Sequence, residues 1–222
     1  LRGVGFIFVL CFLISSVLFL PIDVEYVIYA ILLFAMMISG YLDDASKTPW
    51  NEYKKGLIDL VISVVAVLTY MNFNSTTICF GADEIVIPKA LFLILGVILI
   101  WVSVNVTNCT DGVDGLCASL CSVTLLAFGV LFAPVLQKYA MANFLFLSVL
   151  FAYLYFNSSP SSMLMGDAGS RALGFYIAVI ALKSTHPFIY ILLAAVMIVD
   201  GGIGLVKIAL KRFLKISILK KT

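Results

Sequence analysis

Residues 90–106 read ALFLILGVILIWVSVNV, a run of seventeen positions without a charged side chain. A helix needs about 20 predominantly apolar residues to cross the hydrocarbon core of a bilayer, and this run approaches that length. Further largely apolar runs fill most of the remaining chain, at residues 4–20, 26–42, 57–71, 118–136, 139–156, 168–182 and 188–210. We therefore expect an all-α fold, a polytopic transmembrane helical bundle with about eight crossings.

The composition agrees with a membrane protein. Of the 222 residues, 63% are hydrophobic and 12% are charged, whereas soluble proteins average about half and about a quarter. Neither a linker nor a repeat divides the chain, so we expect one integral membrane domain over residues 1–222. The net charge is only +2, and no basic tract suggests a nucleic-acid partner. Five cysteines suggest neither a disulfide framework nor a metal-binding spacing.

The distribution of Lys and Arg predicts the orientation. If the amino end lies inside, eleven of the fourteen Lys and Arg residues fall on the inner side, as the positive-inside rule requires. This orientation places residues 72–89 outside. Two β-prone stretches flank Gly81 in that segment, so we predict a small external β-hairpin there.

Acidic residues gather in three short loops between the apolar runs. The loops read YLDDASK at 41–47, NVTNCTDGVDGL at 105–116 and NSSPSSMLMGDAGS at 157–170. With the orientation above, all three lie on the cytoplasmic side. They hold five aspartates that one site can share: Asp43, Asp44, Asp111, Asp114 and Asp167.

Each aspartate also has a simpler explanation. Asp167 precedes an apolar run and can cap its helix, and Asp111 and Asp114 alternate with glycines as in ordinary turns. Asp43 and Asp44 end a helix, where the helix dipole disfavours negative charge. That pair needs a nearby cation, for which the sequence offers Lys47, Lys54 and Lys55.

A shared site has a specific chemistry. Carboxylate oxygens suit Mg²⁺, which binds one or two carboxylates together with substrate phosphates. Glycine turns at 112–115 and 166–169 open helices, so backbone N–H groups can approach phosphate oxygens. Arg171 and the three lysines could offset the remaining negative charge. These features suggest a water-soluble diphosphate donor that meets a lipid acceptor.

The three loops resemble those of the polyprenyl-phosphate N-acetylhexosamine-1-phosphate transferase superfamily. Its signatures are an Asp-Asp pair, an Asn-x-x-Asn-x-x-Asp-Gly-x-Asp-Gly-Leu loop and a Met-Gly-Asp-x-Gly-Ser loop, and all three occur here in that order. Thr110 and residues 172–174 are most similar to the phospho-N-acetylmuramoyl-pentapeptide transferase branch.

The resemblance implies a Mg²⁺-dependent reaction of peptidoglycan synthesis. Phospho-MurNAc-pentapeptide would pass from UDP-MurNAc-pentapeptide to undecaprenyl phosphate, giving lipid I and UMP. It also implies a multi-pass protein of the bacterial cytoplasmic membrane with its site on the cytoplasmic face, and it allows a homodimer. Two alternatives stay open: a UDP-GlcNAc:undecaprenyl-phosphate GlcNAc-1-phosphate transferase, and a membrane cation transporter.

The resemblance also implies roles for individual residues. Asp167 would be the main Mg²⁺ ligand, and Asp43 and Asp44 the catalytic pair that assists the lipid phosphate. The expected substrate-binding residues are Lys47 near the phosphates, Asn105, Asn108 and Asp111 at the ribose and phosphates, Asp114, Asn157 and Leu164 at the uracil, and Gly166 in the last glycine turn.

Some features depart from the family pattern. Superfamily members have about ten crossings and, in this branch, a later His-x-His loop, so we expect the sequence to be a fragment that is inactive alone. Asp200 interrupts the last apolar run beside Gly201. It would either line a groove or make a polar contact between packed helices. Residues 207–221 would form a basic end on the inner leaflet.

Overall fold

The computed structural model describes residues 3–46, 48, 50–81 and 83–210. Helices dominate it, and a two-stranded sheet is the other regular element of this part of the chain. The elements are α1 (Gly5–Phe19), α2 (Val24–Ala45), α3 (Glu52–Phe73), β1 (Thr77–Phe80), β2 (Asp83–Val86), α4 (Lys89–Thr110), α5 (Leu116–Leu131), α6 (Ala133–Leu136), α7 (Lys138–Asn157), α8 (Gly166–Lys183), α9 (Ile189–Leu193) and α10 (Ala195–Ala209).

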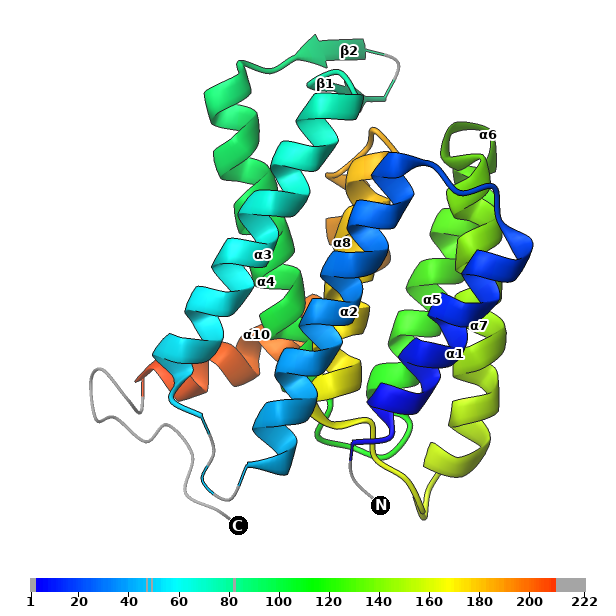
Figure 1. Cartoon of the computed structure of the whole chain (residues 1–222). Helices are drawn as coiled ribbons and strands as arrows, with labels where there is room; N and C mark the ends of the chain where they lie inside the picture. The colour runs from blue at the N-terminus through cyan, green and yellow to red at the C-terminus, as the bar shows by residue number, and fades with distance from the viewer. Residues whose placement is uncertain (1–2, 47, 49, 82, 211–222) are drawn as a thin grey trace.

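The helix α8 forms the centre of the bundle (Figure 1). Nearly every residue from Gly166 to Leu182 is buried, and α1, α2, α4 and α5 pack around it. Glycines permit these close approaches. A Cβ atom on Gly174 would lie 2.7 Å from the Ser103 carbonyl oxygen of α4. The buried position of α8 explains why it can carry polar residues within a membrane protein.

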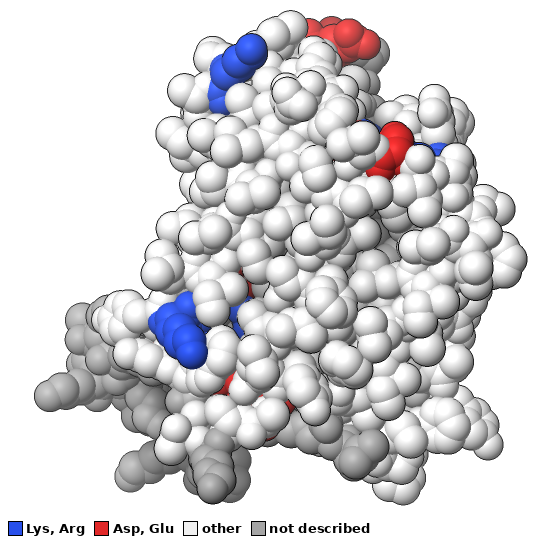
Figure 2. Space-filling model, viewed as in Figure 1, with Lys and Arg blue, Asp and Glu red and all other residues white. Residues whose placement is uncertain are grey.

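Four helices are long and apolar enough to cross a membrane: α2, α3, α4 and α7. The helices α1 and α5 are apolar but shorter, with 15 and 16 residues. On the face in Figure 2, a broad band without charged side chains separates the two ends of the molecule. An all-α membrane bundle is therefore confirmed, although the expected count of eight crossings is not.

Two expected runs are each divided. Residues 118–136 form α5 and then the short α6, at whose start Pro134 lies, because proline cannot continue the hydrogen-bond ladder of the preceding helix. The last run breaks at Ala194 into α9 and α10. The helix α10 lies across the bundle axis in Figure 1, so the last run does not cross as one helix.

The expected hairpin is present. β1 and β2 pair antiparallel, with Thr77 opposite Val86 and Phe80 opposite Asp83. Gly81 has a φ of +66° in the connecting turn, a conformation that glycine adopts without steric cost. The hairpin lies at the end of the bundle opposite the acidic loops (Figure 1).

Of the two expected positions of Asp200, the contact between packed helices is not found. Its side chain is exposed on α10, so it is not a buried contact between helices. Gly201 makes the close contact instead, because a Cβ atom there would lie 2.1 Å from the Val106 carbonyl oxygen. The predicted basic end, residues 207–221, falls mostly outside the described residues.

Candidate active site

The carboxyl end of α2 supplies the first two aspartates. Asp43 is 7% exposed, and its Oδ1 accepts a hydrogen bond of 2.7 Å from the Trp50 backbone N–H. Its Oδ2 forms an ion pair with the Lys55 ammonium group. A cation therefore answers the carboxylate at this helix end, as the helix dipole requires. Lys54 instead stacks over the Trp50 ring at 3.3 Å.

Lys55 links two of the three acidic loops. Besides Asp43, its Nζ contacts Asp167 Oδ2 at 3.2 Å. The two carboxylates come from α2 and α8, and the lysine comes from the first turn of α3. The Lys55 ammonium group thus brings the carboxylates of Asp43 and Asp167 together. Of the two candidate lysines that the structure describes, Lys54 and Lys55, it is Lys55 that makes this contact.

Asp44 lies against the amino end of α8. Its Oδ2 accepts a hydrogen bond of 3.4 Å from the Ala168 backbone N–H, so a residue of α2 caps this helix where Asp167 had been a candidate. Gly166 adopts a φ of +66°, and a Cβ atom there would lie 2.3 Å from Asp44 Oδ2. Only glycine leaves room for this carboxylate, whose charge complements the helix dipole.

The loop after α4 is joined to the loop before α8. Asp114 accepts hydrogen bonds from the Ser161 hydroxyl at 2.7 Å and from the Ser161 N–H at 3.0 Å. These bonds lower the pKa of Asp114. Asn157 Oδ1 accepts from the Gly115 N–H at 3.0 Å, and its amide donates to the Met163 carbonyl at 2.8 Å.

The remaining predicted substrate residues lie along the same end. Asn105 is partly exposed on α4 and donates to the Trp101 carbonyl at 2.8 Å, and Asn108 is partly exposed one turn later. Asp111 follows at the end of α4, and Leu164 is 42% exposed. Lys47 is outside the described residues.

A buried ion pair lies one helical turn from Lys55 and Asp167. Arg171 Nη2 donates to Asp59 Oδ1 at 2.5 Å, and the two side chains are 2% and 3% exposed. Arg171 was expected to offset the site aspartates, but it pairs with Asp59. Sequence reasoning missed Asp59. The signal was a carboxylate inside an apolar run, four residues after Lys55 on α3.

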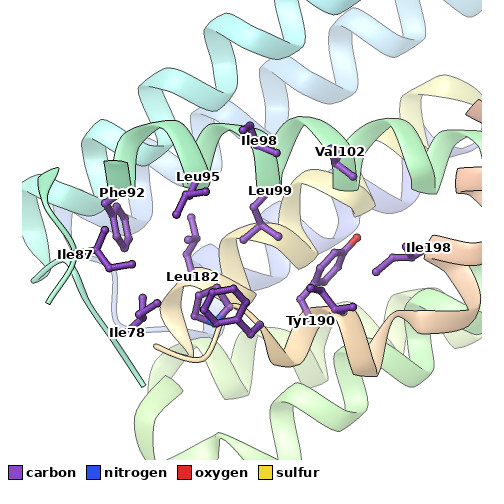
Figure 3. Close-up of a pocket in the computed structure, with 14 residues that line it drawn as sticks. Ile78, Ile87, Phe92, Leu95, Ile98, Leu99, Val102, Leu182, Tyr190 and Ile198 are labelled. Carbon is purple, nitrogen blue, oxygen red and sulfur yellow. The ribbon is translucent and has the colours of Figure 1, made fainter. Parts of the chain in front are cut away.

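An apolar cavity of about 410 Å³ lies beside α4 and contains none of these acidic residues (Figure 3). Phe92, Leu95, Leu99 and Val102 line it from α4, and α9, α10 and the hairpin supply other walls. The spacing of three to four residues marks one face of a helix. Three residues further along that face is Asn105 of the acidic end.

The donor set suits a hard divalent cation. Asp43 and Asp167 share a cationic group in Lys55, and their oxygens are ligands that Mg²⁺ prefers. No cluster of three or more His, Cys, Asp or Glu side chains forms a ready metal site among the described residues. Mg²⁺ commonly takes only one or two protein carboxylates and completes its shell with phosphates and water, so these residues fit such an ion.

Comparison with known proteins identifies the family. The model of glycosyl transferase family 4 matches residues 26–185, a segment that includes all three acidic loops. The chain belongs to this family. The superfamily recognised from the three loops is thereby confirmed.

Named relatives of this glycosyl transferase family 4 member support the predicted branch. The chain is 35% identical to the phospho-N-acetylmuramoyl-pentapeptide-transferase of Treponema pallidum (strain Nichols), over 99% of this chain and 66% of the relative. Proteins of that name from Microcystis aeruginosa and Dictyoglomus thermophilum are 31% and 28% identical, over 82% and 73% of this chain and 53% and 54% of theirs. The chain thus spans about two thirds of the Treponema relative and about half of the other two.

Proposed function

We propose that this chain carries the site of a Mg²⁺-dependent phosphoglycosyl transferase that joins a UDP-linked sugar phosphate to undecaprenyl phosphate. The observation that carries the proposal is the meeting of Asp43 and Asp167 around Lys55, with Asp44 at the amino end of α8. The named relatives make UDP-MurNAc-pentapeptide the proposed donor. The products are then lipid I and UMP.

The reaction exchanges one P–O bond for another. An oxygen of the acceptor phosphate attacks the sugar-linked phosphorus of the donor and forms the new diphosphate. The bond from that phosphorus to the bridging oxygen breaks, and UMP leaves with the electron pair. Bound Mg²⁺ would neutralise the diphosphate and so stabilise the leaving group.

The chain's own residues position the reactants. Asp167 and the Asp43–Asp44 pair provide the oxygens for the cation, and Lys55 supplies positive charge beside the phosphates. One aspartate of the pair would assist proton removal from, or placement of, the acceptor phosphate. Little other chemistry is needed, because phosphoryl transfer depends mainly on positioning and charge stabilisation.

The acidic end also suits the nucleotide. Asn105, Asn108 and Asp111 follow one another along the end of α4 and are proposed to hold the ribose and phosphates. Asp114 and Asn157 are proposed to read the uracil, with Leu164 beside them. Their bonds to Ser161, Gly115 and Met163 hold the two loops together, so the donor would meet a pre-ordered surface.

The lipid acceptor has a matching apolar surface. The cavity beside α4 has almost wholly apolar walls, as an isoprenoid chain requires. Its helix face continues toward Asn105, so a lipid in the cavity could present its phosphate to the acidic end. We place that end at the cytoplasmic face of a bacterial plasma membrane, because the distribution of Lys and Arg along the sequence predicts that the acidic loops lie inside.

The test uses the protein expressed from its complete gene, with undecaprenyl phosphate and Mg²⁺. A panel of UDP-sugar donors is compared by mass of the lipid product; formation of GlcNAc-diphosphate lipid alone would move the proposal to the alternative donor. Asp167→Asn should abolish Mg²⁺-dependent UMP release. Asp83→Asn removes an exposed carboxylate of β2, in the hairpin at the opposite end of the bundle, and should leave release unchanged. Unaltered release by Asp167→Asn refutes the assigned role of Asp167.

A cation transporter fits the fold less well. Transport paths use ionisable residues near the middle of the membrane. The five aspartates lie at helix ends or in loops, and the buried Asp59 is already paired with Arg171.

A further inference from the structure

Two ion pairs connect α3 and α8 on successive helical turns. Lys55 of α3 reaches Asp167 of α8, and four residues later in both helices Asp59 reaches Arg171. The two pairs have opposite orientations: the cation is on α3 in the first pair and on α8 in the second. The backbone of α3 packs mainly on α2 and α4, so these long side chains link α3 to α8.

Arg171 poses a problem for the site next to it. Residues four apart on a helix are neighbours, with Cβ atoms about 5–6 Å apart, so the guanidinium group can compete for Asp167. Within the part of the chain that the structure describes, Arg171 Nε and Nη1 are buried and have no hydrogen-bond partner. A guanidinium group with unused donors needs a carboxylate within reach. Asp59 supplies that carboxylate and engages Nη2.

The Asp59–Arg171 pair leaves the formal charge of the neighbouring site unchanged. Three carboxylates and the Lys55 ammonium group leave the site with a formal charge of −2, which matches one divalent cation. The Asp59–Arg171 pair adds no net charge. Without Asp59, the buried guanidinium would halve the site's negative charge and could take Asp167 as its partner.

We propose that Asp59 is a positioning residue that holds Arg171 away from Asp167, thereby keeping Asp167 available to Lys55 and to a divalent cation. This inference rests on the proposed function for its metal, but the side-chain arrangement can be tested without donor or acceptor. Asp59→Asn should make Arg171 turn to Asp167. Lys55 then loses one of its two carboxylates, and the cation loses its ligand.

The first measurement is binding of Mn²⁺ to the purified protein, followed by electron paramagnetic resonance. Removal of an outer-shell partner typically weakens metal binding 10- to 100-fold, so Asp59→Asn should weaken it by at least about tenfold. The double variant Asp59→Asn/Arg171→Met removes both charges and should bind Mn²⁺ within about twofold of the parent. Arg171→Met alone removes the competitor and should not weaken binding.

The second measurement is acylation of Lys55 by an amine-reactive reagent in the absence of metal, quantified by mass spectrometry. Asp59→Asn should accelerate this reaction, because Lys55 is released from Asp167. Glu25→Gln is the matched control. It weakens another partly buried ion pair, with Lys183 at 3.0 Å, at the opposite end of the bundle. It should change neither Mn²⁺ binding nor Lys55 acylation.

If the Asp59–Arg171 pair only stabilises the fold, its variants should differ from these expectations in Mn²⁺ binding. Weaker Mn²⁺ binding in Arg171→Met as well as in Asp59→Asn, or no recovery in the double variant, overturns the inference. If the Asp59→Asn protein does not fold and cannot be purified, Arg171→Met alone tests the proposal. A loss of Mn²⁺ binding by the folded Arg171→Met protein then counts against it. A parent that releases no UMP but shows the acylation pattern defeats the proposed function and leaves the positioning role intact.

Discussion

Replacing Gly40 by alanine tests how tightly α2 and α8 hold the site together. An added Cβ atom would lie 2.3 Å from the Asp167 carbonyl oxygen and 2.6 Å from the Ala168 nitrogen. Both are backbone atoms of a buried helix, so no flexible side chain can move aside. Ordinary contact begins at 3.4 Å, and the helices must therefore separate by roughly 1 Å.

The expected cost follows from the packing. Overpacking a tight core costs about 1–3 kcal/mol, and each kcal/mol shifts the Tm of a domain of this size by about 2–4 °C. Gly40→Ala should thus lower the Tm by about 2–12 °C. The same displacement separates Asp43 and Asp44 from Asp167, and a misplacement of about 1 Å can reduce turnover about 100-fold.

The assay is thermal unfolding in detergent together with UMP release at saturating donor. Gly56→Ala is the matched control, because that glycine also lies in a helix, but no described residue outside the local helix backbone comes within 4 Å of the added Cβ. Alanine is the better helix former, so this variant should keep or raise the Tm. Equal Tm values and equal turnover for the two variants would refute the close-contact argument.

Three further outcomes are expected. Lys55→Met should lower turnover by about 100-fold and strengthen Mn²⁺ binding, because Asp43 and Asp167 lose their internal cation, whereas Lys54→Met should change neither value. The lowered pKa of Asp114 means that its bonds to Ser161 persist at neutral pH and are lost only as pH falls through that lowered pKa. Ser161→Ala removes the hydroxyl bond and should raise the pKa of Asp114 toward its ordinary value, measured by NMR titration of the carboxyl group; an unchanged pKa contradicts this. Glu25→Gln should cost about 1–3 kcal/mol, measured as a lower Tm, and an unchanged Tm would show that the pair with Lys183 contributes little.

The sequence predicted those features that depend on local composition. Apolar runs bounded by turns marked most helices, and the β-prone stretches around Gly81 marked the hairpin. The break at Ala194 was not predictable in this way, because alanine carries no helix-breaking signal. The direction of α10 depends on the contact between Gly201 and Val106, which joins residues far apart in the chain.

The site was predictable as a gathering of loops but not as a set of contacts. The positions of Asp43, Asp44 and Asp167 at helix ends indicated a shared face. They did not indicate that Asp44 would cap α8 or that Lys55 would bridge the other two carboxylates. Both contacts depend on the rotation of α2, α3 and α8 about their axes. A pattern of apolar runs specifies that rotation only weakly when lipid and protein interior are equally apolar.

The buried Asp59–Arg171 pair connects the fold to the chemistry. Charged residues within membrane helices are costly, and they occur mainly where they face the protein interior and pair with one another. Replacement of such a pair by apolar residues is often neutral or stabilising, so its presence is weak evidence for a role in stability. Its place one turn from Lys55 and Asp167 makes electrostatic control of the site the better explanation. The double variant Asp59→Asn/Arg171→Met separates the two explanations by Mn²⁺ binding, because loss of a merely structural pair should weaken the binding, whereas loss of a charge-balanced pair should leave it close to that of the parent.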